Sequence, residues 1–332
     1  MVIKNLQFLI LISLMGICAI AFPMDKTEKE LENSKIALLN HYFKMVGGES
    51  PINKTNKLPR QMIVSSPKTF CMKLTDLCEQ TLFEELAQKG ISKKDVEEEW
   101  PNQDTIIEEQ FKKQSVTFKP ASSPIKKMVL KQAKERGIAR DLAVVQLENQ
   151  NSIASANNYL VMINEKEFDT YSKASQRTII GHELTHTKQR HVSKINAIEK
   201  LLKEKKQNPT LTPDSEKLYT LFRRNVEIEA DLTAATQDQT SINGYKELTE
   251  SIVRRYGPGM PDTHPANSHR NEASILIDKV IKNHTLFQKK SAKKRLFEDE
   301  PEDQNQPAVT KSQKKQSLTK EKPLAQVNPN KS

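Results

Sequence analysis

The sequence is poor in aromatic residues, cysteine and glycine. Aromatic side chains make up 5% of the 332 residues, with a single Trp, which argues against a ligand site built as an aromatic platform. Hydrophobic residues account for 36% of the chain and charged residues for 28%. This balance is typical of a soluble protein with lean cores and some polar, disordered sequence. The length suffices for one sizeable domain with appendages, or for two small ones.

The sequence also lacks a concentrated basic motif, although positive charge exceeds negative charge. The formal net charge is +10, but the lysines are spread along the chain. No arginine-rich segment occurs, and no basic segment is interleaved with aromatic residues. We therefore expect no nucleic-acid partner and leave peripheral contact with a membrane open.

Only one long apolar run occurs, and it lies at the N-terminus. Lys4 precedes the run from Leu6 to Ala21, which ends in small residues. This pattern predicts a secretory signal peptide over residues 1–21, and hence an exported protein that is periplasmic or secreted. The alternative is a membrane anchor, in which residues 2–21 reach the ~20 residues of a spanning helix.

Two cysteines, Cys71 and Cys78, remain once the signal peptide is removed. In an exported protein, an even number of cysteines favours a disulfide, which would contribute about 2 to 3 kcal/mol by loop closure. We therefore predict a short-range Cys71–Cys78 disulfide. The alternative is two unrelated buried thiols.

Apolar spacing divides the rest of the chain into three regions. Residues 22–120 have helical spacing and no motif that carries chemistry, and could form a pro-segment, a partner-binding extension or an N-terminal subdomain. Residues 288–332 have almost no apolar content and predict a disordered basic tail. Between them, residues 121–287 predict strands at 143–147 and 159–163 and helices at 174–191, 212–237 and 267–287. Strands followed by helices indicate an α+β fold that is mainly helical.

His182, Glu183 and His186 form the pattern HExxH. Two histidines four positions apart lie on one face of a helix, where both imidazoles can reach one zinc ion. Ile179 and Ile180, one turn earlier, place the motif in an amphipathic helix. We therefore predict His182 and His186 as zinc ligands and Glu183 as a general base.

A catalytic zinc ion needs a third protein ligand and an open position for water. The predicted helix at 212–237 carries Glu227 and Glu229. At about 100° per residue, Glu227 shares a face with Asp231 and has apolar neighbours, whereas Glu229 faces outward. The alternative is an ordinary helix with a salt-bridge ladder from Arg224 to Glu227 and Asp231. With the histidine pair upstream, we predict Glu227 as the third ligand.

These motifs resemble those of one peptidase family. The HExxH residues, then Glu227 to Asp231, then His264 with Arg270 follow the order found in HtpX and the CAAX prenyl endopeptidases, which are zinc peptidases of the gluzincin type. The resemblance covers residues 125–285. It is strongest to the soluble, exported branch that includes BepA-like proteases.

The resemblance implies a fold and roles for site residues. It implies a gluzincin domain in which a small sheet accompanies an HExxH helix packed on a Glu-bearing helix. It implies that Glu227 is the third ligand and that Asp231 orients His182. It also implies that Arg270 and His264 approach the site, where His264 donates to an oxyanion or caps the zinc.

The sequence therefore predicts a zinc metalloendopeptidase with one Zn²⁺ per chain and no other cofactor. The resemblance implies that the strand from Ser155 to Met162 pairs with an extended substrate. The expected partners are polypeptides, including unfolded or misfolded envelope proteins, and the sequence predicts no oligomeric state. The alternative is a zinc-containing periplasmic chaperone or assembly factor with a closed metal site and little proteolysis.

Overall fold

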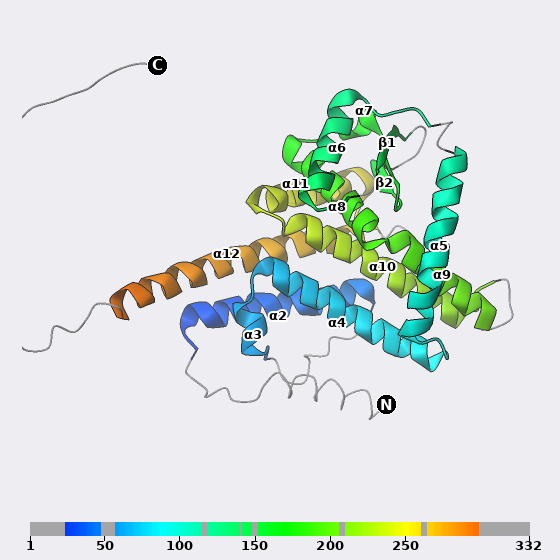
Figure 1. The fold of residues 1–332 in the computed structure, drawn as a ribbon. Helices are drawn as coiled ribbons and strands as arrows, with labels where there is room; N and C mark the ends of the chain where they lie inside the picture. Colours follow the sequence, from blue (N-terminus) through cyan, green and yellow to red (C-terminus); the bar gives the residue numbers. More distant parts are fainter. Residues whose placement is uncertain are drawn as a thin grey trace, which may run out of the picture. The chain divides into compact units, whose positions relative to one another are not determined.

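The computed structural model describes residues 24–47, 57–114, 118–139, 141–147, 152–205, 210–259 and 264–298. Within these ranges the chain is mainly helical with a small sheet, as Figure 1 shows. The elements are α2 (Lys26–Val46), α3 (Arg60–Val64), α4 (Pro67–Gln88), α5 (Lys93–Gln114), α6 (Ser123–Glu135), β1 (Ala143–Gln146), β2 (Ala154–Ala156), β3 (Leu160–Ile163), α7 (Glu165–Phe168), α8 (Lys173–Gln189), α9 (His191–Lys205), α10 (Pro213–Ala235), α11 (Gln239–Tyr256) and α12 (Asn267–Glu298).

Helices α8 and α10 begin at the capping residues that the sequence provides. In α10, the Thr212 hydroxyl oxygen accepts a hydrogen bond from the backbone N–H of Ser215 at 3.4 Å, and Pro213 occupies the first turn. The hydroxyl of Ser172 caps α8 in the same way. Both helices were predicted, and their observed ends lie close to the predicted ones.

Helix α8 ends at Gln189 and is followed by its C-cap residue Arg190, which adopts a left-handed backbone conformation with φ of 54°. This conformation is uncommon for a residue other than glycine. The buried carboxylate of Asp104, on α5, lies 2.5 Å from the Arg190 guanidinium and also accepts a hydrogen bond from Ser193 at the start of α9. These contacts hold the change of direction between α8 and α9.

The sheet has the strand order β1-β3-β2 and is of mixed type, which confirms an α+β fold. β1 is parallel to β3, whereas β2 is antiparallel to it, with Ser155 opposite Met162. The single strand predicted from Ser155 to Met162 is therefore wrong. The side-chain oxygen of Asn157 accepts a hydrogen bond from the backbone N–H of Tyr159, which turns the chain between the two strands.

The larger of two apolar cores joins the N-terminal helices α2 and α4 to α10 and α12. Phe83 packs edge-on against Phe222, and the Tyr42 hydroxyl donates a hydrogen bond of 2.6 Å to Asn225 Oδ1. The described helices of the N-terminal region, residues 22–120, share this core with α10 and belong to the same compact unit.

The smaller core lies between the sheet, α6, α8 and α11. Helix α11, which was not predicted, approaches α8 closely at Gly244. A Cβ atom at this position would lie 2.3 Å from the carbonyl oxygen of Ala174, so a larger residue would push the helices apart. Leu248 and Ile252, one and two turns after Gly244, pack against this core.

Cys71 and Cys78 are both buried, free thiols, so the predicted disulfide is wrong. Both lie on α4, seven residues apart. Two residues separated by seven positions on a helix are about 10 Å apart, beyond the reach of a disulfide. Burial raises the pKa of both thiols to about 12.

Helix α12 continues to Glu298, past the predicted start of the disordered tail at residue 288. Residues 288–298 include four Lys and one each of Arg, Gln, Glu, Ala and Leu, all of which propagate a helix that is already formed. The rest of the tail and the predicted signal peptide, residues 1–21, lie outside the described residues. None of the described helices is long and apolar enough to cross a membrane.

Candidate metal centre

The predicted site residues come together where α8 crosses α10. His182, Glu183 and His186 lie on α8, and all three are buried. Glu227 and Asp231, one turn apart on α10, face them. The remaining two predicted residues, His264 and Arg270, reach the same place from the chain that leads into α12 and from its first turn.

Three atoms of ligand type are evenly spaced at this crossing. His182 Nε2 lies 3.0 Å from His186 Nε2, and Glu227 Oε2 lies 3.3 Å and 3.4 Å from these two nitrogens. Ligand atoms about 2.0–2.1 Å from a tetrahedral zinc ion are separated from one another by about 3.3 Å. The three atoms could therefore hold one ion of this size.

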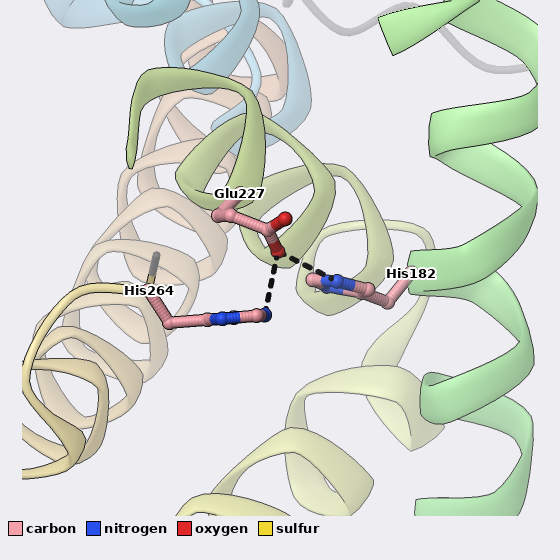
Figure 2. A group of neighbouring side chains, drawn as sticks. All are labelled: His182, Glu227 and His264. Carbon is pink, nitrogen blue, oxygen red and sulfur yellow. Dashed lines mark ion pairs between the residues drawn. The ribbon is translucent and has the colours of Figure 1, made fainter. Parts of the chain in front are cut away.

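Glu227 Oε2 is buried and has no hydrogen-bond partner, although three imidazole nitrogens face it. Figure 2 shows its carboxylate between the rings of His182 and His264. Burial alone would raise the pKa of Glu227, but nearby His186 and His264 lower it well below its ordinary value. A buried carboxylate oxygen without a hydrogen bond is costly, and a cation would compensate it.

The other nitrogen of His182 is held by Asp231. Its Nδ1 lies 2.9 Å from Asp231 Oδ1, which leaves Nε2 directed at Glu227. Arg270 donates two hydrogen bonds of 2.7 Å to the Asp231 carboxylate, and the Tyr245 hydroxyl donates a third of 3.0 Å. The structure thus places Asp231 where the sequence analysis expected a residue that orients His182.

The other nitrogen of His186 is held by a residue that the sequence analysis did not select. His186 Nδ1 lies 3.0 Å from His191 Nδ1, and His191 Nε2 lies 3.2 Å from Glu229 Oε2. The prediction that Glu229 faces outward is therefore wrong. Its carboxylate points toward the start of α9, because the bend at Arg190 brings His191 alongside α10.

Glu183 lies in a cleft beside the three potential ligands. The cleft has a volume of about 110 Å³ and is lined by Ser152, Ile153, Ala154, Ile179, His182, Glu183, Leu248, Ile252, His264 and Arg270. Burial raises the pKa of the Glu183 carboxyl, against the lowering effect of His182 and His186. The aliphatic lining residues come from β2 and the residue before it, from α8 and from α11, and they share the cleft with the charged and imidazole groups.

His264 differs from the other imidazoles of the site. Its Nε2 lies 3.0 Å from Glu227 Oε2, and its side chain is 36% exposed, against 11% for His182. His182, Glu227 and His264 also form a group whose ligand atoms lie within 4.8 Å of one another. His264 could therefore act as a further ligand or stand beside the ion.

No family model, curated protein or solved structure matches this chain. The family resemblance therefore stays a prediction that rests on its three motifs.

Proposed function

We propose that this protein is a zinc-dependent endopeptidase in which His182, His186 and Glu227 hold the metal. The observation that carries the proposal is the spacing of 3.0–3.4 Å between their three ligand atoms, beside a second buried glutamate, Glu183, in an open cleft. Two helical histidines, a third ligand and an adjacent carboxylate are the components that metal-assisted peptide hydrolysis requires.

The residues of the chain divide the chemistry between them. When bound, zinc would act as a Lewis acid that polarises a carbonyl oxygen and acidifies water. Glu183 takes a proton from the attacking water and passes it to the leaving amine. Because burial raises the pKa of Glu183, its carboxylate is a stronger base than an exposed glutamate. His264, which lines the cleft, would donate a hydrogen bond to the oxyanion.

The cleft supports a polypeptide as the substrate. Ala154, at the start of the edge strand β2, lines the cleft, so an extended peptide can lie along β2 with its scissile bond near Glu183. Main-chain hydrogen bonds would then supply affinity with little sequence preference. Misfolded exported or envelope proteins as substrates are part of this proposal, which here rests on the predicted signal peptide and the family resemblance.

One observation favours a second candidate, a zinc-containing chaperone or assembly factor with a closed metal site. His264 Nε2 lies as close to Glu227 Oε2 as a fourth ligand would. Structural zinc sites are closed by four protein ligands, whereas catalytic sites keep one position for water. His264 is partly exposed and lies outside a helix, so its imidazole can move away from the metal. This favours a catalytic site over a closed one.

Zinc content and proteolysis, measured on the same samples, test the proposal. The wild-type protein should bind one zinc ion per chain and cleave unfolded casein. Glu183→Gln should bind zinc equally and cleave at least ~100-fold more slowly, because it loses proton transfer and keeps every ligand. Glu250→Gln, an exposed site on α11, is the matched control.

The outcomes separate the two candidates. If the zinc-bound wild-type protein cleaves casein no faster than Glu183→Gln, and both proteins suppress casein aggregation, the peptidase proposal is wrong. The chaperone is then the better assignment. A wild-type protein that binds no zinc would overturn both.

A further inference from the structure

A row of polar side chains begins at Nδ1 of His186, the ring nitrogen that does not face Glu227. His186 Nδ1 lies 3.0 Å from His191 Nδ1, and His191 Nε2 lies 3.2 Å from Glu229 Oε2. The side chain of His191 is 1% exposed and that of Glu229 is 19% exposed, so the contact between the two imidazoles is shielded from bulk water. The proposed reaction uses neither His191 nor Glu229.

The proton positions in this row follow from a single requirement. If His186 binds a metal through Nε2, its ring proton lies on Nδ1. That N–H must then donate to Nδ1 of His191, which accepts through its lone pair. His191 consequently carries its own proton on Nε2 and donates it to the Glu229 carboxylate. One arrangement of protons satisfies every ring nitrogen in the row.

We infer that His191 and Glu229 are positioning residues that fix the tautomer and orientation of His186 for metal binding. This inference rests on the proposed function. The row gives His186 what Asp231 gives His182, a carboxylate that supports the ligand imidazole, except that an imidazole stands between ligand and carboxylate. Partners of this kind raise ligand basicity and restrict ring rotation.

The backbone at Arg190 makes this arrangement possible. On an unbroken helix, His191 would lie about 140° around the axis from His186, and the two rings would not meet. The left-handed conformation of Arg190 turns the chain, and the ion pair with Asp104 holds the turn. His191 is thereby returned to the side of α8 that faces α10.

Zinc affinity of three His191 variants tests the inference, measured by competition with a chromophoric chelator. His191→Phe keeps a ring of similar size but removes both hydrogen bonds, and its affinity should fall by about 10- to 100-fold. His191→Asn keeps an acceptor for His186 Nδ1–H and should lose only a few-fold. His191→Gln should resemble the Phe variant, because its amide matches the position of Nε2.

Glu229→Gln extends the test to the end of the row. The amide oxygen still accepts a hydrogen bond from His191 but carries no charge, so affinity should fall by a few-fold. Glu216→Gln, an exposed site in the first turn of α10, is the matched control and should leave affinity unchanged.

Two further readouts separate positioning from simple structural support. A purely structural role predicts that the zinc affinity of each variant follows its melting temperature in the metal-free form. His191→Asn would then bind zinc no more tightly than His191→Phe. A positioning role predicts a higher zinc affinity for His191→Asn than for His191→Phe, whatever their melting temperatures. Positioning also predicts that zinc-loaded wild type shows an exchange-protected His186 imidazole N–H proton by NMR, which His191→Phe loses.

Each outcome has a defined meaning. Equal zinc affinity in wild type and all His191 variants would overturn the inference and leave the proposed function intact. A wild type without zinc would overturn the proposed function and the inference with it. If His191→Phe does not fold, the comparison of Asn with Gln still decides, because only Asn retains the acceptor.

Discussion

Arg270 and Asp231 form a two-pronged ion pair, in which Nε and Nη2 of the guanidinium each lie 2.7 Å from one carboxylate oxygen. The pair links the first turn of α12 to α10, directly behind His182. Burial alone would raise the pKa of Asp231, but the charge of Arg270 and the hydrogen bond to His182 hold it well below its ordinary value. Asp231 therefore stays ionised and supports His182 through Nδ1.

Arg270→Lys should weaken zinc binding by about tenfold, because an ammonium cannot reproduce the two parallel hydrogen bonds that fix the Asp231 carboxylate. Zinc content after dialysis against a weak chelator measures the effect. Arg254→Lys, an exposed site on α11, is the matched control. Unchanged zinc retention in Arg270→Lys would show that the ion pair serves only to join the helices.

Glu227→Ala should lose most of the bound zinc, because two ligands remain where three are needed. Glu229→Ala, two residues along the same helix, should still bind one zinc ion per chain, with reduced affinity because it no longer supports His191. Asp231→Ala should weaken affinity by roughly 10- to 100-fold. Atomic absorption after dialysis compares the three, and zinc kept by the Glu227 variant but lost by the Glu229 variant would reverse the assignment of ligands.

Zinc affinity should rise steeply with pH. In the metal-free protein, burial disfavours the charged His182 ring, but the hydrogen bond to Asp231 and the nearby Glu227 carboxylate outweigh burial and raise its pKa to about 10. The ring must release this proton to bind a metal, so protons compete with zinc throughout the range below that pKa. Affinity should therefore increase by up to about tenfold per pH unit between about pH 7 and pH 9.

Calorimetric titration with zinc in two buffers of different ionisation enthalpy measures the release. About one proton per zinc ion should leave His182 at about pH 8. Zinc uptake without proton release would mean that His182 is already neutral, and would contradict this account of its hydrogen bonds.

Tyr42→Phe should destabilise the whole domain by about 1 to 3 kcal/mol, because it leaves the buried side-chain oxygen of Asn225 without its donor. The corresponding fall in melting temperature should be a few degrees, or about 2–4 °C for each kcal/mol. Tyr256→Phe, at a tyrosine that is 50% exposed, is the control and should have little effect. Equal melting temperatures would show that the bond between α2 and α10 adds nothing to stability.

The sequence predicts those parts of the site that depend on local periodicity. Thr212 and Pro213 mark the start of α10, and the four-residue spacing of His182 and His186 places both rings on one face of α8. Helical spacing correctly predicts that the side chains of Glu227 and Glu229 point in different directions. It does not predict the surroundings of Glu229, because residue spacing along one helix does not show which neighbouring helix covers each face.

Other features depend on contacts or conformations that the sequence does not mark. Nothing in the residue type of Arg190 indicates a left-handed backbone, so the approach of His191 to His186 was not predictable.

Helix α11, in contrast, could have been predicted from the sequence. Ile242, Tyr245, Leu248 and Ile252 recur at helical spacing after the capping residue Asp238. The disulfide prediction failed because it considered the number of cysteines and the compartment, whereas the helical backbone of α4 sets the distance between them.

The shared core of α2, α4 and α10 also has a consequence for biosynthesis. The chain is made from its N-terminus, so the residues of α2 and α4 that pack on α10 are synthesised before Glu227 is. His182 and His186 appear earlier still than Glu227, and Arg270 comes last. The segments that support the site are thus synthesised first, then the three proposed ligands, and finally the guanidinium that pairs with Asp231.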